Sequence, residues 1–398
     1  MSRKENEMNP IPADPGKPDA PTGSRPSYAR QALFIALPVL LIFACAELGA
    51  RLRERYIPPM PVDVGQGFNP DDRLFVPGAG GMMETNPQKS TSFQHQRFAL
   101  VKPRDTLRII ALGGSSVNYL DYEFEQMKQD LALALSDRYK DVEIINCGGL
   151  SYGSHRLVLI ASEIIGYAPD VVLLYTGHNE FEELEQMHLA TLSDTKIQRM
   201  LTISAFYRFI RDKTAQQRIK NLEQSRAIRD LSASIPDSSR TWLHRFSEDE
   251  IRTRMADFEK NLETMIQLCQ DNQVPVIIGT VPSNWYRPNL PGKDGERYEA
   301  VTSLFEKGQV DEGIKLGRAL LREATPRHQS SDLENEIIRA VAHRWALPLA
   351  DVEAAIIDAE PRGIPGETLF NDHCHLNPAG NEILRRLYQQ EILNLVQS

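Results

Sequence analysis

Two short segments, about 260 residues apart, carry the residue types needed for nucleophilic acyl transfer. Ser115 follows an apolar run, and Asp372 and His375 lie near the C-terminus. A serine hydroxyl is a weak nucleophile at neutral pH unless an imidazole takes its proton and a carboxylate orients that imidazole. Because Asp372 and His375 are three residues apart, both side chains can face the same way on one turn. We therefore expect this chemistry if the two segments meet in space.

The composition is that of an ordinary globular protein. The chain has 398 residues, of which 41% are hydrophobic and 25% are charged, so it suits one large domain with insertions or two domains. A net charge of −9 and the lack of a basic stripe with interleaved aromatic residues argue against a nucleic-acid partner. The four cysteines have no CxxC spacing, so the sequence indicates neither a zinc site nor a disulfide framework. No cofactor is predicted.

The N-terminal part divides by composition. Residues 1–31 are rich in Pro, Gly, Ser and charged residues and are predicted to be disordered. Residues 32–50 begin with an uncharged apolar stretch and are expected to form a transmembrane signal-anchor helix. A cleaved signal peptide and a buried or interfacial helix stay open as alternatives. Arginines flank the stretch on both sides, so charge does not fix its orientation. Residues 51–104 contain many Pro and Gly residues and are interpreted as a linker into the main domain.

The remaining segment, 105–398, alternates apolar strands with helices. Continuous apolar strands of this kind indicate a parallel sheet covered on both faces. Two helical insertions are expected, at about 181–246 and 295–335, and they could contact a protein partner. The strands are predicted at 107–112, 142–146, 171–175, 274–280 and 347–351.

Polar clusters follow these strands. In doubly wound sheets, ligands bind outside the carboxyl ends of the strands. We expect His178, Asn284 and Trp285 to contact substrate there, although His178 could instead fill a turn and Trp285 could be a rim aromatic residue that covers the core. The clusters are Ser115, Asn146-Cys147-Gly148-Gly149, Gly177-His178-Asn179-Glu180, Asn284-Trp285 and the segment that holds Asp372 and His375.

In this order the clusters resemble the four blocks of the SGNH, or GDSL-type, serine hydrolases, and most of all a bacterial subset with an N-terminal membrane segment and helical insertions. The resemblance covers about 107–396 apart from the insertions. It implies an α/β, flavodoxin-like three-layer fold with a five-stranded parallel sheet. The blocks read Gly113-Gly114-Ser115-Ser116, Asn146 to Gly153, Gly177-His178-Asn179 and Asp372-His373-Cys374-His375.

The resemblance also implies roles. Ser115 would be the nucleophile, His375 the general base and Asp372 its orienting partner. Asn179 would donate its side-chain amide to the oxyanion, and the backbone N–H groups of Ser115, Gly149 and Ser151 are the further candidate donors. The family usually has a glycine where Ser151 stands, so the identity of the second-block donor is left open.

A rival nucleophile is Ser151. It lies in Gly149-Leu150-Ser151-Tyr152-Gly153, a G-x-S-x-G pentapeptide between a strand and a helix, as in α/β-hydrolases. That elbow would lie on only the second strand, and no His-Gly-Gly segment precedes it. The close pair formed by Asp372 and His375 is also unlike the separate loops of α/β-hydrolases. We favour Ser115.

Two other features of these blocks have plain interpretations. His373, Cys374 and His375 have no further clustered ligands near them, so a metal site is not predicted. Cys147 and Cys374 could form a regulatory disulfide, but small buried packing residues are the favoured interpretation.

The resemblance implies a serine esterase that hydrolyses O-acyl esters, O-acetyl among them, on a carbohydrate or envelope glycan through an acyl-enzyme. An O-acyltransferase and a catalytically silent glycan-binding module are the alternatives. The resemblance further implies a single membrane anchor, with the catalytic domain in the periplasm or another extracytoplasmic compartment.

Overall fold

A computed structural model describes residues 28–57, 73–183, 201, 203–210, 212–214, 246–290, 292–324 and 329–397. The chain divides into two compact units. The smaller unit contains Met1–Pro58 and Ser204–Phe206, and the larger unit contains the rest.

The smaller unit holds helix α1, Tyr28–Glu54, which includes the stretch predicted to be a membrane span. Among the residues that the structure describes, no helix is both long and apolar enough to cross a membrane. The predicted span over 32–50 is therefore helical, but its assignment as a transmembrane segment is not supported. Most of the predicted disordered tail, residues 1–27, lies outside the described residues.

The larger unit is built on a five-stranded parallel sheet with the strand order β5-β4-β6-β7-β8. The first strand therefore lies between the second and the third, which is the flavodoxin-like order predicted from the sequence. The chain changes direction across the sheet between β4 and β6, so this is the switch point where a ligand crevice forms. The strands are β4 Thr106–Gly113, β5 Asp141–Gly148, β6 Val171–Tyr175, β7 Val276–Gly279 and β8 Leu349–Ala350.

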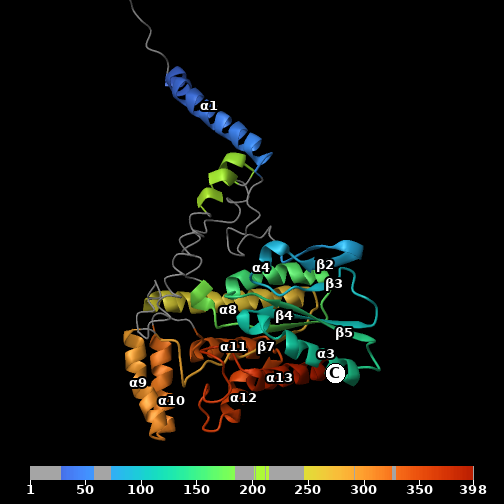
Figure 1. Ribbon diagram of the computed structural model, residues 1–398, viewed down its shortest axis with the longest axis vertical. Coiled ribbons are helices and arrows are strands. Elements are labelled where there is room, and N and C mark those ends of the chain that lie inside the picture. The colour runs from blue at the N-terminus through green and yellow to red at the C-terminus, as the bar shows by residue number, and fades with distance from the viewer. Residues whose placement is uncertain are drawn as a thin grey trace, which may run out of the picture. The chain divides into compact units, whose positions relative to one another are not determined.

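Helices cover both faces of this sheet (Figure 1). Helix α4, Ser154–Ile164, packs with α8, Glu248–Asp271, on one face, and α11, Asp332–Arg344, packs against α8. Helix α3, Asp121–Ala134, packs with α13, Pro378–Gln397, on the other face. Such a three-layer arrangement explains why the central strands are continuous apolar runs instead of alternating ones.

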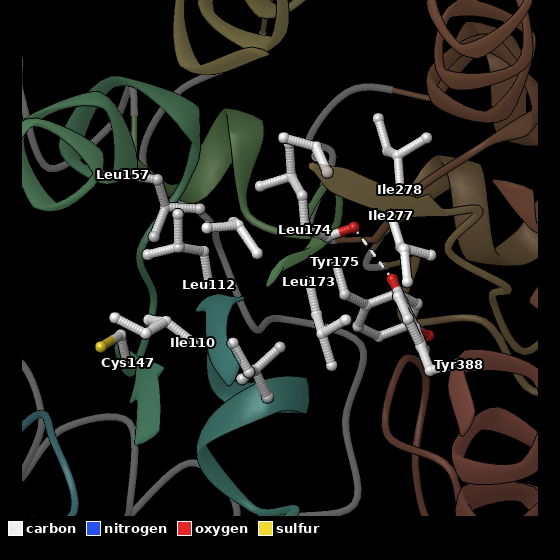
Figure 2. Packing of buried hydrophobic residues seen from close by; sticks show 14 of the residues in the cluster. Ile110, Leu112, Cys147, Leu157, Leu173, Leu174, Tyr175, Ile277, Ile278 and Tyr388 are labelled. Atoms are coloured by element: carbon white, nitrogen blue, oxygen red, sulfur yellow. Dashed lines mark hydrogen bonds between the residues drawn. The ribbon is translucent and has the colours of Figure 1, made fainter. Parts of the chain in front are cut away.

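The core lies between the central strands and these helices. Every residue of β4, β6 and β7 is buried. Figure 2 shows Leu157 of α4 beside Leu112 of β4, and Tyr388 of α13 beside Tyr175 of β6. The Tyr388 hydroxyl donates to the carbonyl of Leu174 at 2.9 Å, so the closing helix is fixed to the central strand by a buried polar contact.

The segment before β4 differs from its prediction. Strands β1 Phe75–Pro77, β2 Met82–Thr85 and β3 Arg97–Ala99 form a three-stranded antiparallel sheet. The prediction of a linker over 51–104 is therefore wrong for this part, and residues 58–72 of it lie outside the described residues. Strands of three or four residues between Gly and Pro turns give too few positions for a hydrophobic period to be seen.

The predicted insertions are partly described. The first, about 181–246, lies mostly outside the described residues. In the second, about 295–335, α9 Lys293–Glu306 and α10 Val310–Glu323 pack against each other as a hairpin. The hairpin has a small apolar cluster of its own, separate from the main core. Helix α12, Val352–Ala359, then leads from β8 towards the C-terminal segment. The domain boundaries themselves stay a prediction.

A buried cluster of charges lies beneath the loops at the carboxyl ends of β5 and β6. The side chains of Glu180, Glu183, Arg156 and Arg254 are each at most 3% exposed. Glu183 contacts Arg156 at 2.8 Å and Arg254 at 2.9 Å, and Glu180 contacts Arg254 at 2.6 Å. Burial by itself would raise the pKa of Glu183, but the two guanidinium groups outweigh it and lower that pKa.

The same carboxylates hold the start of α4. Glu183 accepts the N–H groups of Gly153, His155 and Arg156 at 3.0 to 3.1 Å. Glu180 accepts both the N–H and the hydroxyl of Ser154, at 2.9 and 2.7 Å. The segment after β6 therefore satisfies the first N–H groups of α4, which have no partner within their own helix.

Replacing Arg254 with Met should lower the free energy of unfolding by about 3–5 kcal/mol, because it leaves two buried carboxylates with one arginine. Arg252→Met is the matched control on the same helix. Arg252 is 74% exposed and pairs with Asp249, so its loss should cost less than about 1 kcal/mol. Urea unfolding of the full chain measures both. Equal losses for the two variants would contradict a structural role for the buried cluster.

Candidate active site

The structure brings the two distant segments together. The Ser115 hydroxyl donates to Nε2 of His375 at 2.8 Å, which is within the hydrogen-bond reach that a general base needs. Nδ1 of the same ring contacts Oδ2 of Asp372 at 2.6 Å. Because a carboxylate can only accept, the proton of the neutral ring lies on Nδ1, and Nε2 is free to receive the proton of the serine. This is the geometry of a serine–histidine–aspartate triad.

Asp372 is fixed by its own loop. Its Oδ1 accepts the N–H groups of Cys374 at 2.9 Å and of His375 at 2.8 Å, while Oδ2 holds the His375 ring. Burial would raise the pKa of Asp372, but these hydrogen bonds outweigh it and hold the pKa well below its ordinary value. The carboxylate therefore stays charged and keeps the imidazole in one tautomer and one orientation.

Ser115 is the first residue of the short helix α2, Ser115–Asn118, which directly follows β4. Its N–H is therefore at a helix start, where no intrahelical acceptor exists. A methyl group at Gly114 would lie 2.3 Å from the side-chain nitrogen of Asn179. Glycine at this position lets the amide of Asn179 reach the backbone beside the serine.

Asn179 is nearly buried and is held in place by the second block. Its Nδ2 donates to the carbonyl of Tyr152 at 3.1 Å. An amide NH₂ carries two hydrogens, so one remains for an oxyanion. The side chain that the sequence singled out as an oxyanion donor thus lies beside Ser115, with one N–H committed to structure.

Ser151 presents a backbone N–H in a left-handed conformation, with φ of 61°. Arg156 donates to its carbonyl, and its hydroxyl donates to Oε1 of Glu182 at 2.7 Å. Within the described residues, its N–H makes no hydrogen bond. A non-glycine residue in this region is uncommon and is held here by its surroundings.

Gly149, by contrast, is not an available donor. Its N–H donates to the carbonyl of Gly113 at 3.0 Å and so continues the pairing of β5 with β4. The prediction that Gly149 contributes to the oxyanion hole is therefore wrong. The donors that the structure leaves available are the N–H groups of Ser115 and Ser151 and the amide of Asn179.

The rival nucleophile is disfavoured by the same contacts. The hydroxyl of Ser151 is engaged with Glu182, which is a carboxylate, whereas the hydroxyl of Ser115 contacts an imidazole. The second arrangement supplies the better base, because the ordinary pKa of an imidazole lies near neutral pH and that of a carboxylate lies well below it.

His178, predicted to contact substrate, is buried behind the nucleophile loop. Nε2 of its ring contacts the carbonyl of Pro282 at 2.9 Å, and Nδ1 contacts the hydroxyl of Ser116 at 3.4 Å. A carbonyl only accepts, so Nε2 carries the proton and Nδ1 accepts from Ser116. Burial lowers the pKa of His178 to about 4, which keeps the ring neutral. It supports the loop and does not replace His375.

Asn284 and Trp285 are placed differently from the prediction. Asn284 is 4% exposed, and it donates from Nδ2 to the carbonyl of Asp372 at 2.8 Å and from its N–H to the carbonyl of His373 at 3.0 Å. Trp285 is 3% exposed and belongs to the apolar cluster of the α9–α10 hairpin. Neither is a substrate contact, because one holds the loop of the triad and the other fills a core.

The cysteines of this region are buried free thiols, at Cys147 and Cys374. In the part of the chain that the structure describes, Asp372, Cys374 and His375 form the one group of metal-ligand types, with atoms within 4.8 Å of one another. A metal there would compete for Nδ1 of His375 and Oδ2 of Asp372. Burial and the nearby carboxylate of Asp372 also raise the pKa of Cys374, which disfavours the thiolate that metals prefer.

Sequence reasoning missed the residues that support the oxyanion donors. Glu182 and Glu183 belong to an acidic run that follows Asn179, and Arg156 lies in what looked like an ordinary helix. One signal could have found them. Two acidic residues follow the end of a buried strand, where an unpaired carboxylate is costly, so arginine partners for them could have been expected.

The low pKa of His178 predicts a pH dependence of stability. Between pH 6.5 and 4 the unfolded chain binds a proton on this ring that the folded chain does not, so stability falls as the pH falls. Over this window His178 should cost about 3 kcal/mol of unfolding free energy. His178→Asn should remove that part of the decline, as measured by urea unfolding at pH 7, 5.5 and 4. Identical declines in the two proteins would contradict a buried neutral ring.

Comparisons with other proteins were made by sequence and by structure. The sequence matches no family model and no curated protein. Among solved structures, a GDSL-like lipase of Bacteroides thetaiotaomicron is 12% identical, with 73% of this chain and 89% of that chain covered and a TM-score of 0.37. An acetylxylan esterase of Geobacillus stearothermophilus is also 12% identical, with 72% and 93% covered and a TM-score of 0.38.

A further acetyl xylan esterase is 16% identical, with 72% of this chain and 99% of that chain covered and a TM-score of 0.38. At these identities and TM-scores, the likeness by itself decides neither fold nor function. The sheet order, the four blocks and the triad geometry of this chain stand on their own, and they agree with the resemblance to SGNH hydrolases.

Proposed function

We propose that the protein is a serine hydrolase that cleaves carboxylic esters through an acyl-enzyme. One observation carries this proposal: the continuous chain of hydrogen bonds from Ser115 through His375 to Asp372, at 2.8 and 2.6 Å. Such a chain activates a hydroxyl that is otherwise unreactive at neutral pH.

In the first step, Oγ of Ser115 attacks the ester carbonyl while Nε2 of His375 takes the hydroxyl proton. Asp372 stabilises the imidazolium that forms. The negative charge that develops on the carbonyl oxygen is received by the N–H groups of Ser115 and Ser151 and by the amide of Asn179. The carbon–oxygen bond to the alcohol then breaks, and His375 returns its proton to the leaving oxygen.

In the second step, water attacks the acyl group on Ser115, with His375 again as the base, and the carboxylic acid is released. If a sugar hydroxyl takes the place of water, the same residues perform an acyl transfer. The proposed substrate is an O-acyl ester on a carbohydrate, O-acetyl among them. This finer proposal is supported by the resemblance to SGNH hydrolases. Membrane anchoring and an extracytoplasmic location stay predictions from the sequence.

Replacing Ser115 with Ala should abolish turnover of p-nitrophenyl acetate and labelling by a fluorophosphonate probe, with a loss of at least about 1,000-fold in kcat. Ser116→Ala is the matched control, because that neighbouring hydroxyl contacts His178 and not His375. The control should keep its labelling. Labelling that survives in Ser115→Ala and disappears in Ser151→Ala would overturn the assignment. A wild-type protein that neither labels nor turns over ester would favour a binding module.

Asn179→Ala should lower kcat about 100- to 1,000-fold with little change in KM, because the lost donor acts on charge that exists only in the transition state. Fluorophosphonate labelling should persist at a slower rate, since the triad is intact. Asn394→Ala, on the exposed side of α13, serves as the control for loss of an asparagine. A change confined to KM would show that Asn179 binds ground-state substrate instead.

A further inference from the structure

A hollow of about 570 Å³ lies beside the triad, on the side of the His375 ring. Its lining comes from the nucleophile helix, from the start of α3 and from the loop and helix that follow Asp372. The lining combines apolar side chains with polar ones; the polar and aromatic residues used below are Tyr119, Tyr122, Glu123, Asn371, His375 and Asn381.

The lining shows which part of an ester this hollow would receive. It includes His375, whereas Ser115, Ser151 and Asn179, which hold the oxyanion, are not among its described lining residues. The leaving oxygen must lie at Nε2 of His375, because it takes the proton from that atom when the carbon–oxygen bond breaks. The alcohol part of the ester, attached to that oxygen, therefore extends into the hollow, and the acyl part lies on the oxyanion side.

Glu123 is the one carboxylate among the described residues that line this hollow. It is 8% exposed, and among the described residues its carboxylate has no hydrogen-bond or ion-pair partner. Its oxygens are not among the described buried polar atoms that lack a partner, so they are reached from the hollow that the residue lines. Its place in the first turn of α3 supplies the favourable end of a helix dipole, which helps to hold a negative charge there. Both carboxylate oxygens can accept hydrogen bonds from a ligand bound in the hollow.

The other lining groups indicate what the donors belong to. Tyr119 and Tyr122 are 54% and 72% exposed, so their rings offer flat apolar faces at the rim. The ring of Tyr119 lies 5.2 Å from that of His375, next to the expected leaving oxygen. Asn371 and Asn381 add groups that both donate and accept. The described lining contains no Lys or Arg, so nothing in it favours an anionic alcohol.

Resting on the proposed esterase function, we propose that this hollow is the subsite for the alcohol part of the substrate. It selects an uncharged polyhydroxylated alcohol, a sugar, whose hydroxyl groups donate to Glu123 while its ring lies against the tyrosines at the rim. Glu123 is then a specificity residue: it contacts the leaving alcohol and takes no part in the proton transfers.

The test compares two esters of the same acid with the full-length protein. One is a mono-O-acetylated methyl glucoside, whose alcohol part carries hydroxyl donors, and the other is p-nitrophenyl acetate, whose alcohol part has none. Glu123→Gln keeps the size of the side chain but removes its charge. It should lower the ratio of kcat/KM for the sugar ester to that for p-nitrophenyl acetate by about tenfold or more, mainly through the KM of the sugar ester.

Glu125→Gln is the matched control, because Glu125 lies on the same helix with its side chain exposed and should leave the ratio unchanged. Asn381→Ala should shift the ratio in the same direction as Glu123→Gln, which guards against a folding defect in one variant. Ethyl gluconate, whose hydroxyl groups lie on the acyl side, should be a poorer wild-type substrate than the sugar acetate.

An unchanged ratio in Glu123→Gln, or an equal preference for ethyl gluconate, would overturn the subsite while leaving the esterase intact. Failure of the proposed function is recognised separately, by a wild-type protein that is neither labelled by fluorophosphonate nor able to hydrolyse p-nitrophenyl acetate, and that result would end both proposals.

Discussion

Two buried carboxylates, on Glu180 and Glu183, join the loop after β5 to the loop after β6, and the proposed oxyanion donors depend on this junction. Each carboxylate accepts backbone N–H groups at the start of α4 and is paired with an arginine. A buried charge that loses its partner costs several kcal/mol, so each of these contacts favours the others. The N–H of Ser151 and the amide of Asn179 are therefore held at a fixed separation before any substrate binds. Preorganised donors of this kind stabilise the charge of the transition state without a cost of rearrangement.

The base is supported in a different way. Asp372 and His375 lie on a loop that is closed by an isolated bridge between Phe370 and Leu376 and by neighbouring backbone hydrogen bonds, and the side chain of Asp372 is 46% exposed. Asp372 is held by N–H groups within this loop, and the loop itself is held by Asn284, which lies 88 residues earlier in the chain. The site thus combines an oxyanion side built into the protein interior with an acid–base side at the surface. The hollow proposed for the alcohol part lies on the second side, where groups of varied size can be accepted without disturbing the buried charges.

The sequence was sufficient to predict those features that depend on a local pattern of residues. Continuous apolar runs predicted the central strands, because a strand covered on both faces has no polar side, and the residues after these runs predicted where Ser115 and Asn179 would lie. The sequence was insufficient where a residue's role depends on a partner that is distant in the sequence. Strands β1 to β3 are too short to show a period, Trp285 looks the same whether it lines a pocket or fills a core, and nothing near Arg254 in the sequence indicates that it neutralises carboxylates about 70 residues away. Gly149 was misassigned for the same reason, since the pairing of its N–H with Gly113 belongs to the sheet and not to its own segment.

The choice between hydrolysis and acyl transfer follows from the same geometry. The acceptor in the second step approaches along the path by which the alcohol left, because His375 serves both steps from one nitrogen. Once the alcohol departs, its subsite is open to solvent at Tyr119 and Tyr122, both of which are exposed at the rim. Water then reaches the acyl-enzyme unless another alcohol occupies the subsite first. If the proposed subsite holds a sugar through Glu123, an acceptor that binds there equally well would exclude water and receive the acyl group. Under the proposed mechanism, hydrolysis is therefore the expected outcome. Acyl transfer would require an acceptor that binds the proposed alcohol subsite tightly enough to compete with water.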